Sequence, residues 1–285
     1  MNRRKLLTLV PAAGAALSLP STAKPIPSGA LLPSGFAIAV QCWSFKEFTL
    51  FEAIEMSAAA GATAVEIFPG QTVGGVFGKA KVEPAMPDDQ LDAILEHCKQ
   101  HGITPVNYGV TKVPKDEGEA RLIFNFAKTL GLYGITTESL EALDTLEKLA
   151  KEFDLKVCFH NHPKPTKLWN PDKIWKAIEG RDERIGYCAD IGHWATSGLV
   201  PLEVIRKIAP RVHAFHMKDR AEIGKWTHDR PFGTGIIDNI AILDEVRKHG
   251  FAGNVSIEYE HNWKHSQPEI AQCAGYLRAY GKMRA

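Results

Sequence analysis

The sequence predicts an α/β fold, a single (β/α)8 (TIM) barrel domain preceded by a cleavable signal peptide. Three observations support this. From Phe36 onward, short β-rich apolar runs alternate with amphipathic stretches, as in βα units repeated around a parallel sheet. The 285 residues, 45% of them hydrophobic, can bury one large core. The first 23 residues differ from the rest in composition.

Eight strands are predicted from the apolar runs. They span Ala37–Gln41, Ala64–Phe68, Thr104–Tyr108, Gly134–Glu138, Lys156–Asn161, Ile185–Asp190, Val212–Met217 and Val255–Glu260. Helical periodicity between them predicts helices at Asp88–His101, Glu117–Leu130, Leu140–Phe153, Pro201–Ala209, Asn239–His249 and Gln267–Tyr280. The order of these elements indicates one domain, residues 36–285.

The leader, residues 1–23, begins with Arg3-Arg4-Lys5, continues with an apolar run from Leu6 to Leu19 and ends with Ser21-Thr22-Ala23. This pattern predicts a signal peptide and export to the periplasm. The arginine pair resembles a twin-arginine signal, and an ordinary secretory signal is the alternative. The apolar run is too short for a stable membrane span. Residues 24–35, rich in Pro and Gly, are predicted to be a linker.

Charge and cysteine content exclude several classes of protein. The formal net charge is +1, and loss of Arg3, Arg4 and Lys5 with the leader changes it to −2, which argues against nucleic-acid binding. The five cysteines are odd in number and show no C-x-x-C spacing, so buried thiols are the preferred interpretation. A small neutral carbohydrate is a better partner, and a homo-oligomer is compatible with the sequence.

Carboxylates and imidazoles stand at the predicted strand ends. In (β/α)8 barrels the active site is built at the C-terminal ends of the strands, so these side chains should converge on one mouth. A cluster of carboxylates with imidazole suits a divalent ion such as Mn²⁺, Mg²⁺, Co²⁺ or Zn²⁺, and without a cation the carboxylates would repel one another. The strand ends concerned are Val65-Glu66, Thr137-Glu138, Phe159-His160-Asn161-His162, Ala189-Asp190-Ile191-Gly192-His193, Phe215-His216-Met217-Lys218-Asp219-Arg220 and Ile257-Glu258-Tyr259-Glu260.

With these motifs the sequence resembles the xylose isomerase-like superfamily of sugar phosphate isomerases and epimerases. The segments that carry the resemblance most strongly are Ala189-Asp190-Ile191-Gly192-His193, His216-Met217-Lys218-Asp219, Gly233-Thr234-Gly235-Ile236-Ile237-Asp238 and Ile257-Glu258-Tyr259-Glu260. The resemblance covers essentially the whole chain after the leader. It is specific for the superfamily and weak for any one activity within it.

The resemblance implies a metal site and catalytic roles. In relatives such as ketose 3-epimerases and inosose dehydratases, four strand-end residues bind one divalent ion, commonly Mn²⁺. The matching positions are Glu138, Asp190, His216 and Glu258. The same relatives use the two glutamates to move protons, which assigns that role to Glu138 and Glu258, and the position of His193 implies contact with the substrate.

Other strand-end residues have both a functional and a structural interpretation. Glu260 shares the strand parity of Glu258 and could compete for the ligand position. His160 and His162 could line the pocket, bind a second ion, or form a hydrogen-bonded loop. Glu66 could contact substrate hydroxyls or pair with a basic residue, and Arg220 could clamp the substrate or form a surface salt bridge.

We therefore expect a metal-dependent isomerase or epimerase that removes a proton beside the carbonyl of an unphosphorylated sugar and passes through an enediolate. One alternative is a lyase or hydratase that acts on 3-keto-glycosides or inososes with the same residues. Another is a noncatalytic periplasmic sugar-binding barrel. An apurinic endonuclease shares the barrel, but the charge and the leader argue against DNA.

Overall fold

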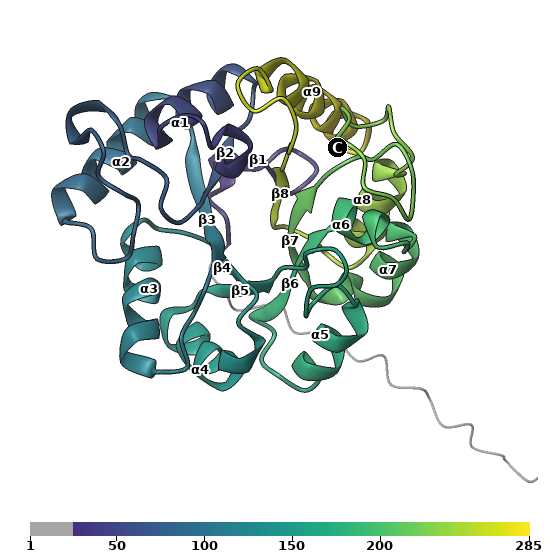
Figure 1. Cartoon of the computed structure of the whole chain (residues 1–285), viewed down its shortest axis with the longest axis horizontal. Coiled ribbons are helices and arrows are strands. Elements are labelled where there is room, and N and C mark those ends of the chain that lie inside the picture. The colour runs from purple at the N-terminus through teal and green to yellow at the C-terminus, as the bar shows by residue number, and fades with distance from the viewer. Residues whose placement is uncertain (1–24) are drawn as a thin grey trace, which may run out of the picture.

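The computed structural model describes residues 25–285 and confirms the predicted barrel. Eight parallel strands close into a ring in chain order, with β1 paired to β8, and helices surround them (Figure 1). The strands are β1 Ala37–Gln41, β2 Ala64–Ile67, β3 Thr104–Thr111, β4 Gly134–Thr137, β5 Lys156–Phe159, β6 Ile185–Asp190, β7 Val212–Met217 and β8 Asn254–Ile257. The predicted signal peptide lies outside the described residues.

The helices form the outer layer, and α9 packs beside α1 so that the first and last helices complete the ring (Figure 1). They are α1 Leu50–Ala59, α2 Asp88–Gln100, α3 Glu117–Thr129, α4 Leu143–Phe153, α5 Pro171–Ile178, α6 Ile191–Thr196, α7 Pro201–Ile208, α8 Asn239–Lys248 and α9 Gln267–Met283. The predicted helices agree with these bounds to within a few residues. The sequence analysis did not predict α1, α5 or α6.

The alternating direction of side chains along each strand gives the barrel two cores, one between strands and helices and one inside the barrel. Successive side chains of a strand point to opposite faces, so every second residue points into the barrel. The outward residues, such as Ile38 and Val40 of β1, pack under the helices in the main hydrophobic core. The inward residues are small near the strand starts, for example Ala37 and Ala39. Further along, the inward residues become polar, and this is where the candidate site begins.

Residues 25–35, where the sequence indicates a linker, pack against the barrel. Ile26 and Ala30 are 2% exposed and join a small apolar cluster with inward residues at the strand starts, including Ala37, Ala64 and Val106. The carbonyl of Ala30 accepts a hydrogen bond from Thr63 Oγ1 at 2.7 Å. This segment therefore covers the end of the barrel at which the strands begin.

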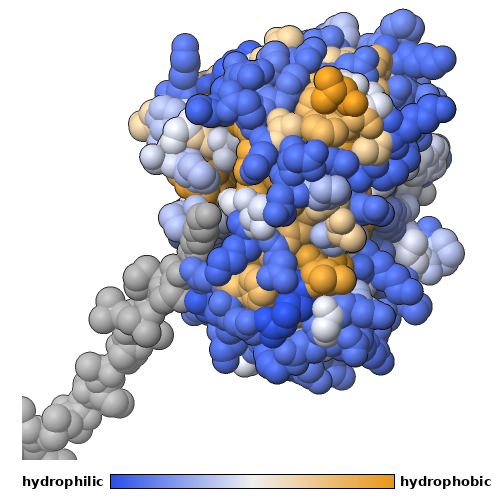
Figure 2. Space-filling model, turned by 90° about the vertical axis from the view of Figure 1, so that its left-hand side faces the viewer, coloured by the Kyte–Doolittle hydropathy of each residue, from blue (hydrophilic) through white to orange (hydrophobic). Residues whose placement is uncertain are grey.

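The surface is mostly polar. Hydrophilic residues dominate the face in Figure 2, and apolar residues occupy limited areas between them. Within residues 25–285, no helix is long and apolar enough to cross a membrane. The interpretation of the cysteines as buried thiols is confirmed for all five: Cys42, Cys98, Cys158, Cys188 and Cys273.

Candidate active site

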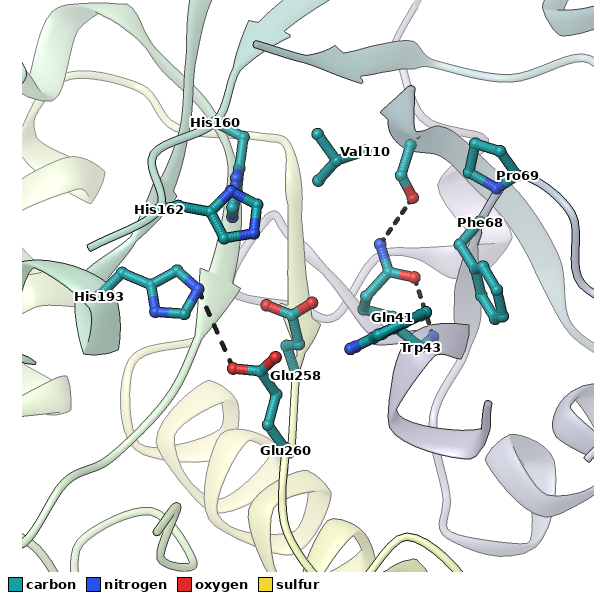
Figure 3. A pocket seen from close by; sticks show the side chains of 11 residues that line it. Gln41, Trp43, Phe68, Pro69, Val110, His160, His162, His193, Glu258 and Glu260 are labelled. Atoms are coloured by element: carbon teal, nitrogen blue, oxygen red, sulfur yellow. Dashed lines mark hydrogen bonds and ion pairs between the residues drawn. The ribbon is translucent and has the colours of Figure 1, made fainter. Parts of the chain in front are cut away.

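A pocket of about 270 Å³ opens at the C-terminal ends of the strands (Figure 3). Its size is close to the roughly 300 Å³ lower bound for small-molecule sites. Imidazoles and carboxylates line one side, and apolar groups line the other, with Trp43 edge-on to Phe68. The lining residues are Gln41, Trp43, Phe68, Pro69, Gly109, Val110, His160, His162, His193, Glu258 and Glu260.

The central polar residues of the site point into the barrel because alternate side chains of a strand point inward. Asp190 pairs with His216 across β6 and β7, so their side chains enter the barrel at one level. Lys218 stands two residues beyond His216, and Glu258 two residues beyond Ser256, which pairs with His216. Both side chains therefore point inward one step nearer the mouth.

Lys218 lies at the centre of this group. Its ammonium, which is fully buried, lies 2.6 Å from Asp190 Oδ2, is hydrogen-bonded to Glu258 Oε2, and lies 3.1 Å from Glu260 Oε2. Burial acts to lower the pKa of Lys218, but the carboxylates of Asp190, Glu258 and Glu260 raise it well above the usual value. Lys218 is therefore a cation at neutral pH.

Asp190 has both carboxylate oxygens engaged. It is the N-cap residue of α6, where Oδ1 accepts a hydrogen bond from the backbone N–H of His193 at 2.7 Å. Oδ2 accepts the bond from Lys218. Burial acts to raise the pKa of Asp190, but the Lys218 ammonium and the hydrogen bond from His160 outweigh burial and hold the pKa well below the ordinary range. The helix start thus fixes the orientation of this carboxylate.

His216 lies between two glutamates. Its Nε2 is 3.1 Å from Glu66 Oε1, and its Nδ1 is 3.2 Å from Glu258 Oε2. Glu66 also accepts hydrogen bonds from the hydroxyls of Thr136 at 2.6 Å and Ser256 at 2.7 Å. Glu66 is completely buried and does not line the pocket, so the structure places it beneath His216, where it orients the ring.

Glu138 faces the two histidines that follow β5. Its Oε1 lies 2.9 Å from His160 Nδ1 and 2.6 Å from His162 Nδ1. Burial acts to raise the pKa of Glu138, but these two imidazoles outweigh burial and lower it to about 2. The structure therefore joins Glu138 to His160 and His162, whereas Asp190 and Glu258 contact Lys218 and His216 contacts Glu258.

His193 and Glu260 border the pocket, and their closest side-chain atoms are 4.0 Å apart (Figure 3). Burial lowers the pKa of His193 well below its usual value, so the ring is neutral. Arg220 is buried away from the pocket. It donates to the carbonyl of Thr227 at 2.6 Å and lies 3.2 Å from Asp229.

A loop beside the site is organised by Asp219. Its carboxylate accepts hydrogen bonds from the backbone N–H groups of Gly233 at 3.0 Å, Gly235 at 2.9 Å and Ile237 at 3.0 Å. A Cβ atom at Gly235 would lie 2.2 Å from Asp219 Oδ1, so this close approach requires glycine. The glycine-rich turn before α8 therefore serves to hold this carboxylate.

The donor set suits a divalent cation. Donor atoms of four buried residues lie within 4.8 Å of one another: His160, Asp190, His193 and Glu258. Among the described residues, Nδ1 of His193 is buried without a hydrogen bond. A buried unpaired nitrogen is costly, so a ligand at this atom would stabilise the site. Imidazole with carboxylate suits ions such as Zn²⁺ or Mn²⁺.

Sequence analysis left three contributors out of the primary site. Gln41, at the end of β1, donates to the carbonyl of Gly109 at 3.0 Å and contacts His216 at 3.4 Å. Lys218 was named only as part of the strand end that follows His216, although its parity with His216 directs it into the barrel. Asp229 accepts a hydrogen bond from the backbone N–H of Glu260 at 2.6 Å, and no sequence spacing indicated this contact.

The fold agrees with a family comparison. Residues 134–280, just over half of the chain, match the family model described as xylose isomerase-like TIM barrel. The chain belongs to this enzyme family.

Known proteins extend the comparison. The chain is 28% identical over 144 residues to an inosose dehydratase of Clostridium tetani, a match that covers 45% of this chain and 48% of that protein. The chain thus spans about half the length of this curated relative. It is 32% identical to a solved structure of a protein from Parabacteroides distasonis described as putative and uncharacterized, with a TM-score of 0.70 and coverage of 86% of this chain and 99% of that chain.

Two more distant structures share the fold and contain metal ions. The IOLI protein, solved with a zinc atom, has a TM-score of 0.66, 16% identity and coverage of 88% of this chain and 99% of that chain. A barrel protein of Mycobacterium smegmatis in complex with magnesium has a TM-score of 0.71, 14% identity and coverage of 89% and 99%.

Proposed function

We propose that this protein is a metal-dependent enzyme that removes a proton from the carbon beside the carbonyl of an unphosphorylated sugar or keto-sugar. One observation carries the proposal: Glu258 and Glu260 share a pocket with three imidazoles beside a donor set that suits a divalent ion. A carboxylate that lines the pocket can accept such a proton. Isomerisation or epimerisation is the leading outcome.

Glu258 is the proposed base. Burial acts to raise its pKa, but Lys218 and His216 hold the pKa well below the ordinary value, so the carboxylate is in the deprotonated form that can accept a proton, while the same two cations lower its basicity. Glu138, held by His160 and His162, is the second proton-moving group that family resemblance implies. A base on each side of a planar enediolate is the arrangement that epimerisation requires.

The neutral substrate-binding groups lie around these carboxylates. His193 is uncharged and borders the pocket, so its ring can donate to or accept from a sugar hydroxyl. Trp43 and Phe68 offer apolar faces against which sugar C–H surfaces can pack. Val110 and Pro69 add to the apolar lining of the pocket.

The metal would be held by Asp190 and Glu258 together with imidazole nitrogen, and Mn²⁺ is the proposed ion, with Mg²⁺, Co²⁺ and Zn²⁺ as alternatives. The ligand set from family resemblance completes the site with Glu138 and His216, whereas the donor distances favour His160 and His193. A bound divalent ion would polarise the carbonyl and stabilise the negative charge of the enediolate.

Elimination is the second candidate. The curated relative reported above is an inosose dehydratase, a name that describes loss of water from a cyclic polyhydroxy ketone. The same proton removal, followed by departure of a group from the next carbon, gives this outcome. The two candidates therefore share their first step and differ only in whether a leaving group departs.

Proton NMR in D₂O tests the proposal. Protein loaded with Mg²⁺, which spares the NMR signals, is incubated with ketoses, inososes and 3-keto-glycosides, and we expect metal-dependent deuterium uptake beside the carbonyl. Uptake alone indicates isomerisation or epimerisation, and an additional alkene or released aglycone indicates a lyase. The Glu258→Gln variant should show no uptake. Uptake at the wild-type rate in this variant would contradict the assigned base.

A further inference from the structure

We infer that the Lys218 ammonium is a tethered cation that occupies the divalent-metal position between Asp190 and Glu258, so that a metal ion binds there only after Lys218 withdraws. The inference deepens the proposed function, because it rests on the proposed metal position. It concerns how the site is kept stable without metal and how metal gains entry.

The Lys218 ammonium lies where the proposed ligands would hold a metal ion. The ammonium of Lys218 contacts Asp190 Oδ2 at 2.6 Å and Glu258 Oε2, and these are the only two residues common to both proposed ligand sets. The side chain of Lys218 is 0% exposed. The ammonium therefore lies between the carboxylates of Asp190, Glu258 and Glu260 and is not exposed to solvent.

The buried carboxylates of Asp190 and Glu258 need a positive charge between them. Asp190 and Glu258 are buried in the described structure, and two ionised carboxylates at close range destabilise each other unless a cation lies between them. The nearest cation to both is Lys218. The ammonium supplies the counter-charge that a divalent ion would otherwise supply.

Lys218 and a metal ion need the same oxygen atoms. Asp190 Oδ1 is already bonded to the backbone N–H of His193, which leaves Oδ2 as the oxygen for a ligand, and Lys218 holds Oδ2. An ammonium and a divalent cation on one buried oxygen repel each other strongly. Binding of the metal therefore requires the ammonium to leave Oδ2.

The ammonium has another partner within reach. Glu260 Oε2 already lies 3.1 Å from Lys218 Nζ and 3.7 Å from Arg220 Nη2, and it belongs to a carboxylate at the pocket wall. The stem of Lys218 packs closely against Gly192, where an added Cβ atom would lie 2.6 Å from Lys218 Cβ. A swing of the ammonium toward Glu260 would open the metal position and keep the lysine paired.

Metal binding to Lys218→Met tests the inference. Methionine keeps the length of the side chain and removes its charge, so we expect Mn²⁺, measured by isothermal titration and by electron paramagnetic resonance, to bind about tenfold more tightly or better than to wild type. Lys156→Met is the matched control, because Lys156 is a buried lysine at the start of β5, at the other end of the barrel. Its Mn²⁺ affinity should equal that of wild type.

The outcomes separate this inference from the proposed function. If only Lys218→Met binds Mn²⁺, the inference is supported and metal dependence of the native enzyme is wrong. Equal or weaker Mn²⁺ binding by Lys218→Met overturns the inference and leaves the proposed function in place. If neither protein binds Mn²⁺, both are overturned.

A crystal of wild-type protein soaked in Mn²⁺ gives a second measurement that does not depend on the variant folding. We expect anomalous density between Asp190 and Glu258, with Lys218 Nζ moved toward Glu260. Manganese bound there with the ammonium still on Asp190 Oδ2 would overturn the inference.

Discussion

Gly192 and Lys218 are in direct contact, and the contact leaves no room for a side chain on the glycine. A Cβ atom at Gly192 would lie 2.6 Å from Lys218 Cβ and 2.8 Å from its Cδ. These atoms belong to the stem of the lysine, which is held from both ends, by β7 and by the carboxylates. The glycine of the Asp190-Ile191-Gly192-His193 segment therefore has a packing role.

Gly192→Ala is accordingly expected to displace the stem of Lys218 and to lower the free energy of unfolding by about 1–3 kcal/mol, as overpacking in a buried site does. Chemical denaturation measures the loss. Gly275→Ala is the control, since a Cβ there meets only Arg278 at 3.8 Å within α9, and helix propensity favours alanine. A Gly192→Ala protein as stable as wild type would contradict the packing role.

Asp219 should control the loop before α8. Asp219→Ala leaves the N–H groups of Gly233, Gly235 and Ile237 without their acceptor, and each lost bond to a charged group costs about 1.5–3 kcal/mol at most. We expect these three amides to exchange with solvent much faster, as measured by hydrogen exchange. Asp238→Ala, which removes only the α8 N-cap bond to Ala241, is the control and should leave the exchange of Gly233 unchanged.

Single histidine substitutions distinguish the two ligand sets. If the set from family resemblance is correct, His216→Ala abolishes metal binding and His193→Ala retains it. If the set given by the donor distances is correct, His193→Ala abolishes metal binding and His216→Ala retains it. Inductively coupled plasma mass spectrometry of purified proteins reads the occupancy directly. Asp190→Asn should lose the metal in either case, and full occupancy in that variant would remove Asp190 from the site.

Asp244 on α8 should make a pH-dependent contribution to stability. Hydrogen bonds from Arg284, at 2.9 Å, are the largest cause that lowers its pKa, and Tyr280 adds to the effect. A carboxyl whose pKa is lower in the folded state stabilises the fold above its unfolded pKa of about 3.9, and the contribution is lost as pH falls below that value.

Asp244→Asn should therefore lower the free energy of unfolding by at most about 1 kcal/mol at pH 7, because the bridge is partly exposed and screened by solvent. The difference between variant and wild type should shrink toward zero near pH 2. Urea titrations at both pH values check this. A difference that stays constant with pH would mean that packing, not charge, causes the effect.

The leader gives a prediction that lies outside the described residues. If the arginine pair acts as a twin-arginine signal, replacing Arg3 and Arg4 together by lysine should keep the protein in the cytoplasm of its host. Cell fractionation followed by N-terminal sequencing measures this, with cleavage after Ala23 expected for the exported wild type. Normal export of the double variant would indicate the ordinary secretory pathway instead.

The barrel could be predicted because its signal is local. Each strand is an apolar run that is followed by a segment with the helical periodicity of apolar residues. The order of these segments along the chain therefore indicates the eight βα units. The short helix α6 was missed because six residues give too little periodicity to detect.

The details of the site could be predicted only in part. Strand parity predicts that Asp190, His216 and Glu258 point into the barrel, and in the structure Asp190 pairs with His216 across two strands while His216 contacts Glu258. Parity does not say which way a side chain rotates, so the pairing of Glu138 with His160 and His162 was not foreseen. Long side chains such as Lys218 add reach that a spacing rule does not include.

Ile26 and Ala30 close the barrel at the strand starts, while the pocket opens at the strand ends. A fusion partner, an affinity tag or a surface linkage placed ahead of Pro25 would therefore be attached behind the molecule, with the substrate entrance directed away from it. Immobilised through that end, the protein should accept substrates as freely as it does in solution. Trimming the chain beyond Ile26 would instead expose the apolar layer formed by Ala37, Ala64 and Val106.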